Sequence, residues 1–224
     1  QPPCTEAVLA SGVKRVIVGC TDPNPVVAGR GIRLLREKGL EVVAGVLRGE
    51  CERQNEVFFH FMRTKLPFTV LKYAMTLDGK TATVLGKSQW ITGEAARKRV
   101  HEDRGRYMAI LTGVSTVLAD NPQLTCRIPG GKNPIRVIAD TKLRTPLSST
   151  VVQTARETPT WIVTAVSDAG RKKAYEDAGC RVLSVPAKEG ELDLQAMMQL
   201  LGEEKVDSVM VESGGTLAWS FLKA

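Results

Sequence analysis

The chain has 224 residues, of which 43% are apolar and 25% charged, as is usual for a globular protein. These values argue against a disordered tail, a fibre and a coiled coil, and the length allows one large or two small domains. Lysine and arginine outnumber acidic residues by 31 to 24. The resulting charge of +7 is spread along the chain, so it favours anionic small molecules at least as much as nucleic acid. Aromatic residues, at 5%, are too few for an evident base-stacking surface.

The apolar runs and the cysteines of the sequence indicate in which cellular compartment the protein is expected. No apolar run approaches the roughly 18 residues that a membrane helix needs, so no membrane association is expected. Five cysteines stand at positions 4, 20, 51, 126 and 180. Their odd number and wide spacing argue against a disulfide framework and indicate a reducing compartment, so we expect a cytoplasmic protein. The first residue is Gln1 and not Met, and we therefore expect a fragment of a longer protein.

The first third of the chain alternates between helix and strand patterns. The predicted elements are a helix over Cys4–Ser11, a strand over Arg15–Gly19, a helix over Arg30–Lys38 and a strand over Glu41–Val46. Strand, helix and strand at this spacing predict a parallel unit. A longer amphipathic helix is expected over Glu50–Arg63, with Val57, Phe58 and Phe61 in the core.

Pro67 ends that helix, so a domain boundary is predicted at Thr64–Pro67, giving domains 1–66 and 67–224. A strand is expected over Phe68–Met75. Further strands are predicted over Met108–Thr112, Ile135–Ala139, Trp161–Thr164, Arg181–Val185 and Ser208–Val211. Helices are predicted over Glu94–Arg104, Ser167–Ala178, Leu192–Leu201 and from Gly215 onward. The pattern indicates an α/β sheet with interleaved helices.

The sequence contains no complete P-loop motif. Gly86-Lys87-Ser88 and Gly79-Lys80-Thr81 both lack the earlier glycine of a P-loop, since Thr81 and Ala74 stand there. A different cradle is plausible at Glu212–Thr216, where an apolar strand runs into Gly214-Gly215 and then a helix. From spacing alone, an ordinary strand-to-helix turn fits this segment equally well.

Two more polar clusters follow predicted strands. One comprises Lys72–Lys80 and Ser88–Thr92, where Thr92 can cap the next helix. On that helix Arg97 and Arg104 lie two turns apart and could face an anion, although such pairs are more often solvated charge. The other cluster spans Thr112–Arg127 and carries Asp120 and Arg127. Clusters at three strand ends in one domain favour a functional site.

Zinc chemistry is incomplete in this sequence. Pro3-Cys4 matches half of a P-C-x-x-C signature, but Ala7 replaces the second cysteine. His60 and His101 are not in an H-x-E motif, and one ligand cannot hold zinc.

Taken together, these motifs resemble the bifunctional deaminase-reductases of riboflavin biosynthesis. Gln1–Ala7 is similar to the end of that family's zinc motif, and Asp22–Gly31 to a downstream deaminase signature. Leu71-Lys72, Thr76–Lys80, Ser88–Thr92, Thr116–Pro122 and Glu212–Thr216 match its reductase half. The resemblance covers essentially the whole chain and implies part of a cytidine-deaminase-like domain followed by a dihydrofolate-reductase-like α/β domain with an incomplete C-terminus.

The resemblance implies a bifunctional enzyme that deaminates a phosphoribosylamino-pyrimidine with zinc and then reduces its ribosyl group to ribityl with NADPH. The implied NADP-contacting positions are Ala74, Trp90, Thr116, Asp120, Thr141 and the run Gly214, Gly215, Thr216, Leu217, Ala218, Trp219 and Ser220. The implied substrate positions are Ser88, Arg104, Leu124, Arg127, Glu212, Asp22 and Asn24, with Lys72 also in reach. Cys4 is the one zinc ligand present, so this chain is not expected to deaminate.

Hydride transfer to a sugar carbon needs an opened, electrophilic sugar and a positioned acid. We therefore expect Glu212 and Asp120 to transfer protons, Lys72 to polarise the opened sugar, and Arg104 and Arg127 to bind the substrate phosphate. The expected partner is a small phosphorylated pyrimidine, with no nucleic acid, in a homo-oligomer. The alternatives are a folate or pteridine reductase of the same fold and, from another class, a basic nucleic-acid-binding module.

Overall fold

The computed structural model describes residues 4–223, and the chain divides into two compact units that meet between Lys65 and Leu66. This junction lies within the segment Thr64–Pro67, where the sequence predicts a domain boundary. No helix among residues 4–223 has the length and apolar character needed to span a membrane.

The first unit is built around one pair of parallel strands. Its elements are α1 (Cys4–Ala10), β1 (Arg15–Val18), α2 (Arg30–Glu37), β2 (Glu41–Ala44), α3 (Arg48–Gln54) and α4 (Glu56–Thr64). β1 and β2 pair in parallel from Arg15 opposite Glu41 to Val18 opposite Ala44, as the strand-helix-strand pattern predicts. Gln1, Pro2 and Pro3, part of the predicted zinc motif, lie outside the described residues.

The single helix expected over Glu50–Arg63 is wrong, because the chain forms two helices there. Asn55 leaves helical geometry at φ −115°, and its side-chain amide donates to the Cys51 carbonyl, which ends α3. The second helix begins at Glu56 in a new phase. Phe59 is therefore buried at 6% exposure, while Phe58, expected in the core, is 40% exposed.

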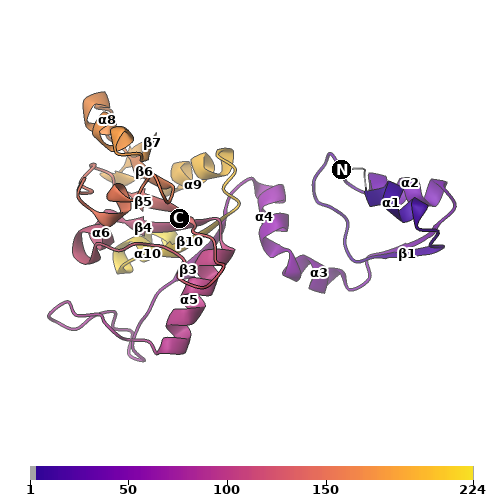
Figure 1. Ribbon diagram of the computed structural model, residues 1–224, viewed down its shortest axis with the longest axis horizontal. Coiled ribbons are helices and arrows are strands. Elements are labelled where there is room, and N and C mark those ends of the chain that lie inside the picture. Colours follow the sequence, from indigo (N-terminus) through magenta and orange to yellow (C-terminus); the bar gives the residue numbers. More distant parts are fainter. Residues whose placement is uncertain (1–3, 224) are drawn as a thin grey trace. The chain divides into compact units, whose positions relative to one another are not determined.

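The second unit contains a six-stranded, wholly parallel sheet in the order β3-β10-β4-β5-β6-β7 (Figure 1). These strands are β3 (Phe68–Lys72), β4 (Ala109–Gly113), β5 (Ile135–Ala139), β6 (Thr160–Thr164), β7 (Arg181–Ser184) and β10 (Ser208–Glu212). The helices are α5 (Glu94–Arg106), α6 (Val114–Asp120), α7 (Thr150–Gln153), α8 (Ala169–Asp177), α9 (Leu194–Glu203) and α10 (Gly215–Lys223). A small hairpin of β8 (Ala187–Lys188) and β9 (Glu191–Leu192) and the short α7 were not predicted from the sequence.

The sheet is buried on both faces, as is usual for parallel sheets. Alternate residues of β4, β5, β6 and β10 form one core with Met197 and Leu201 of α9, and Leu217 and Phe221 of α10 pack against it. The intervening residues, among them Ile110, Ile138, Ile162 and Met210, are at most 1% exposed on the opposite face. Both faces of the sheet are therefore packed with apolar side chains.

All six strands end at the same edge of the sheet because all are parallel. β3 ends at Lys72, not at Met75 as expected, because β10 pairs with it only as far as Glu212. Lys72 and Glu212 are therefore register partners at the carboxyl ends of neighbouring strands. Open α/β sheets bind their ligands at this edge.

Candidate active site

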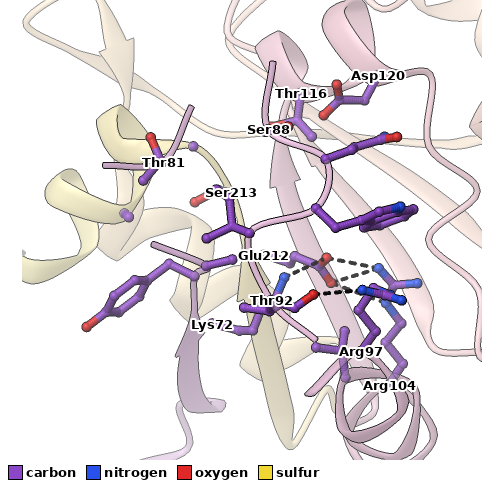
Figure 2. A pocket seen from close by; sticks show the side chains of 18 of the residues that line it. Lys72, Thr81, Ser88, Thr92, Arg97, Arg104, Thr116, Asp120, Glu212 and Ser213 are labelled. Atoms are coloured by element: carbon purple, nitrogen blue, oxygen red, sulfur yellow. Dashed lines mark hydrogen bonds and ion pairs between the residues drawn. The ribbon is translucent and has the colours of Figure 1, made fainter. Parts of the chain in front are cut away.

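A cleft of about 1270 Å³ lies at the carboxyl edge of the sheet, lined by segments that follow β3, β4 and β10 and by α5 and α10. It collects most of the reductase residues predicted from the sequence. The predicted residues that line it are Lys72, Ala74, Ser88, Trp90, Arg104, Thr116, Asp120, Arg127, Glu212, Gly214, Gly215, Ala218 and Trp219. Segments more than 100 residues apart in the chain thus meet in one site (Figure 2).

Glu212 is the centre of the polar network in this cleft. Its Oε1 accepts a hydrogen bond from Lys72 Nζ at 3.2 Å, across the β3–β10 register. Arg104 of α5 donates to both carboxylate oxygens, from Nη2 at 2.9 Å and from Nε at 3.2 Å. Figure 2 shows the carboxylate lying between these two cations.

This environment keeps Glu212 ionised. Burial alone would raise its pKa, but Arg104 and Lys72 outweigh that effect by charge and hydrogen bonding and hold the pKa of Glu212 below its usual value. A carboxylate with a lowered pKa is a poor proton donor near neutral pH. The expectation that Glu212 supplies a proton therefore does not fit this geometry, and the carboxylate instead orients Lys72 and Arg104.

The two arginines of α5 are both engaged within the protein. Besides its bonds to Glu212, Arg104 donates from Nη1 to the Thr125 carbonyl at 3.0 Å. Arg97 donates to the Thr92 carbonyl at 2.7 Å, and its guanidinium lies 4.6 Å from the centre of the Trp90 ring. Arg104 therefore has most of its donors on protein oxygens, and Arg97 is held by one hydrogen bond and by its contact with the Trp90 ring.

Trp90 itself stays largely open to solvent, with 70% of its surface exposed. Arg97 covers one face of the indole, which leaves the other face available for stacking. This arrangement suits a tryptophan that contacts a planar ligand.

The glycine turn after β10 leads into α10 as the sequence predicts, but only one side of the helix faces the cleft. Gly215, Ala218, Trp219 and Leu222 line it, at helical spacing. Leu217 instead packs in the core, near Gly113, and Ser220 donates to the Thr216 carbonyl. The contiguous run Gly214–Ser220 thus reaches the cleft only in part.

The Gly214-Gly215 turn can accommodate the phosphate of a bound cofactor. A Cβ built on Gly214 or Gly215 meets no described atom within 4 Å, so the backbone there is open to a ligand. The first N–H groups of a helix lack partners within it. Ser213 Oγ, which lines the cleft, is buried and has no hydrogen-bond partner among the described residues. The residues present therefore fit a dinucleotide cofactor.

The remaining predicted reductase residues lie on α6, in the loop after it and in the segment after β5. Asp120 ends α6 and, with Thr116, lines one side of the cleft (Figure 2). Arg127 lines it too, but Leu124 is 3% exposed and does not, so Leu124 shapes the loop from within. Thr141 lies past β5, where its hydroxyl donates to Glu191 at 3.3 Å, and it is not part of the cleft lining.

The predicted deaminase residues Cys4, Asp22 and Asn24 belong to the first unit. Asp22 Oδ1 accepts from the Asn24 amide and Asn24 Oδ1 from the Val26 amide, so both side chains shape the turn before α2. Cys4 is exposed at the start of α1. No group of three potential metal ligands is present among residues 4–223, so the described residues do not fit a zinc site.

Sequence reasoning missed several residues of the cleft, notably His101 and Lys98 on α5. Their position three and six residues before Arg104 places them on adjoining parts of one helix surface. That spacing is a signal that could have identified them once Arg104 was placed in the site.

The parallel sheet and the cleft at its carboxyl edge define an α/β domain of the dihydrofolate-reductase-like type. A search against family models matches residues 67–224 to the RibD C-terminal domain. The chain therefore belongs to the RibD family.

Individual relatives support this assignment. Riboflavin biosynthesis protein RibD of Actinobacillus pleuropneumoniae is 48% identical over 223 residues, covering 100% of this chain and 59% of that protein. The crystal structure of a diaminohydroxyphosphoribosylaminopyrimidine deaminase/5-amino-6-(5-phosphoribosylamino)uracil reductase from Thermotoga maritima matches with a TM-score of 0.84 and 38% identity. This match covers 100% of the chain and 60% of that structure.

A riboflavin biosynthesis reductase of Saccharomyces cerevisiae is similar over 69% of this chain and 66% of its own, with a TM-score of 0.53 and 26% identity. The chain spans about 60% of the length of the bacterial RibD proteins that it matches.

Proposed function

We propose that this chain supplies the reductase activity of a RibD protein, which reduces the ribosyl group of 5-amino-6-(5-phosphoribosylamino)uracil to ribityl with NADPH. The observation that carries the proposal is the Lys72–Glu212–Arg104 network, which lies in the cleft beside an open glycine turn. The names of the Thermotoga and yeast relatives support the reaction class.

The cofactor would lie against the Gly214-Gly215 turn, the open face of Trp90, and Thr116 and Asp120 on α6. Unhindered backbone amides at a helix start suit a pyrophosphate. When bound, a reduced nicotinamide supplies the hydride. The protein residues supply position and charge.

Lys72 is the residue that we assign to the reacting sugar. Its Nζ is held at 3.2 Å from Glu212 and carries protons that can be donated to the sugar oxygen as the ring opens. Glu212 keeps Lys72 in place and accepts a hydrogen bond from a sugar hydroxyl with its remaining lone pairs. Reduction of the opened form then consumes one hydride and one proton.

Arg127 is the residue that we assign to the substrate phosphate. It lines the cleft and has no acidic partner in the described part of the chain. A guanidinium binds phosphate through two parallel hydrogen bonds. Arg104 has most of its donors on Glu212 and Thr125, so it contributes mainly by holding the carboxylate.

The first test is cofactor binding, measured by quenching of tryptophan fluorescence on titration with NADPH and with NADH. We expect quenching by NADPH at lower concentration, and a smaller signal from Trp90→Phe, whose remaining tryptophans Trp161 and Trp219 report any cofactor still bound. Equal affinity for both cofactors, or none for either, would contradict the proposal.

The second test is turnover of the phosphoribosylamino-uracil with Glu212→Gln. This change keeps the shape of the side chain but removes the charge that orients Lys72. We expect turnover to fall by at least about 100-fold, a typical effect of losing one acid–base or positioning group, with NADPH affinity within about threefold of the parent. Thr141→Val, outside the cleft lining, serves as the matched control for turnover. Unchanged turnover in Glu212→Gln would remove Glu212 from the reaction.

A further inference from the structure

His101 lines the cleft, and the proposed reaction assigns it no role. It stands on α5 three residues before Arg104, so the two side chains share one surface of the helix. It is partly buried, and its main contacts are with the loop that carries Arg127.

Both ring nitrogens of His101 face donors of Arg127. Nε2 of His101 lies 3.4 Å from Nε and 3.3 Å from Nη2 of Arg127. Nδ1 lies 3.3 Å from the Arg127 backbone nitrogen. A neutral imidazole has one acceptor, so it accepts either from the guanidinium at Nε2 or from the backbone N–H at Nδ1. The contact with the guanidinium is a hydrogen bond in the tautomer whose Nε2 accepts.

The charges around His101 favour this neutral form. Burial lowers its pKa most, and the guanidinium groups of Arg104 and Arg127 lower it further. The Thr125 carbonyl and the Glu212 carboxylate act in the opposite direction but do not reverse the shift. The imidazole therefore remains a hydrogen-bond acceptor for Arg127 near neutral pH.

The same contact fixes the direction of the guanidinium. His101 occupies the edge of Arg127 formed by Nε and Nη2, which leaves the edge formed by Nη1 and Nη2 unused. That second edge has the spacing needed for two parallel bonds to a phosphate. The loop is also tied to α5 at its base, where Cys126 Sγ donates to the His101 carbonyl at 3.1 Å.

We propose that His101 is a positioning residue that orients the Arg127 guanidinium toward the phosphate of the sugar substrate. The inference rests on the proposed function, because Arg127 is assigned to the phosphate there. His101 touches neither the reacting carbon nor the cofactor turn in this assignment. Its loss therefore weakens binding of the phosphate and leaves the chemical step unchanged.

The experiment measures the binding of ribose 5-phosphate and of ribose to the complete chain by calorimetry. His101→Gln and His101→Met form a matched pair of similar length, of which only glutamine keeps an acceptor near the Nε2 position. We expect His101→Gln to bind ribose 5-phosphate within about threefold of the parent, and His101→Met about tenfold more weakly, as for loss of one hydrogen bond to a charged group. His101→Ala gives the same comparison if the methionine variant fails to fold.

A double-mutant cycle shows whether His101 acts through Arg127. If it does, His101→Met has no further effect in an Arg127→Ala background, because the residue it orients is gone. An equal effect in both backgrounds, or unchanged binding of ribose 5-phosphate by His101→Met, would overturn the positioning role.

Steady-state kinetics provide an independent readout. We expect His101→Met to raise KM for the phosphorylated substrate at unchanged kcat, whereas general damage to the fold would lower kcat as well. NADPH titration of the same proteins separates the two proposals. A parent chain that binds neither NADPH nor ribose 5-phosphate would refute the proposed function and this inference together. Normal binding of both by the parent and by His101→Met refutes the inference alone.

Discussion

Glu212 shows how a buried acid can stay charged when two cations offset its desolvation. Its side chain is 20% exposed, and Arg104 is exposed at only 10%. A buried ion pair is not in itself strong evidence for stability, but removing one partner leaves the others unpaired. Because some solvent reaches Glu212, we expect Glu212→Gln to lower the free energy of unfolding at neutral pH by roughly 2 kcal/mol, less than for a fully buried pair.

The lowered pKa of Glu212 also predicts how stability depends on pH. A carboxyl whose folded pKa lies below its unfolded value of about 4.5 stabilises the fold above that pH. This contribution is lost as the pH falls through the folded pKa. Thermal melts at neutral pH and at successive values below about 4.5 should therefore show a smaller acid-induced loss in Glu212→Gln than in the parent. Parallel losses in the two proteins would contradict the assignment of this carboxylate as ionised.

A third prediction for single residues concerns the contact between Trp90 and Arg97. Replacing Arg97 by Met keeps much of the side chain's bulk but removes its charge above the indole and its bond to the Thr92 carbonyl. We expect NADPH to bind about fivefold more weakly, which corresponds to roughly 1 kcal/mol for one cation–π contact. Arg99→Met, on an exposed part of the same helix, is the control, and an equal loss there would point to a general charge effect.

The secondary elements show what could be predicted from the sequence. β5 was predicted with its observed ends, and the strand before Gly214 lacked only Glu212, because runs of β-branched residues bounded by turns are clear local signals. The end of β3 was not predictable in this way. Tyr73, Ala74 and Met75 continue the pattern of a strand, but the partner that would pair with them ends at Glu212.

In the candidate site, too, some features could be predicted from the sequence and others depend on the tertiary structure. Lys72, Trp90 and Glu212 lie in motifs that match the family, and the structure places all three in the lining of one cleft. The internal use of Arg97 and Arg104 could not be foreseen, because it depends on where α5 lies against β10. His101 belongs to no motif, and its contact with Arg127 joins residues 26 positions apart.

β5 contains a buried arginine that no sequence pattern distinguished from surface charge. Arg136 is 0% exposed, and burial lowers its pKa to about 10, so it remains charged at neutral pH. Its guanidinium donates to six protein oxygens, which lie in the segments around α7, at Thr160 and at Gln123 at the base of the Arg127 loop. One side chain thus joins a strand, a helix and a loop of the site.

We therefore expect the stability of the second unit to depend on Arg136, which joins β5 to the segments around α7. In Arg136→Met several buried carbonyl and hydroxyl oxygens lose their donor, and we expect the free energy of unfolding to fall by at least roughly 3 kcal/mol. Arg136→Lys should restore little of this loss, because one ammonium cannot reach donors placed around a planar fork. Urea unfolding measures both values. Full recovery by lysine would show that charge, and not geometry, is what this site needs.

For the molecule as a whole, the two units differ in how much core they possess. In the first unit the buried hydrophobic residues are Leu35, Val42, Phe59 and Phe61, around two short strands. The second unit buries both faces of a six-stranded sheet. Hydrogen exchange followed by mass spectrometry should show faster exchange in β1 and β2 than in β4, β5 and β6. Equal protection would mean that the first unit draws stability from elsewhere.

The position of β10 in the sheet determines when the sheet can be completed during synthesis on the ribosome. It is the last strand along the described chain, yet it lies between β3 and β4, and Glu212 meets a lysine 140 residues earlier. At typical translation rates β3 must wait on the order of 10 s for this neighbour to emerge from the ribosome. During that interval the nascent chain has no completed cleft, and the strands on either side of the gap carry unpaired backbone groups. Protection by chaperones in that period would matter more for this topology than for one in which successive strands are neighbours.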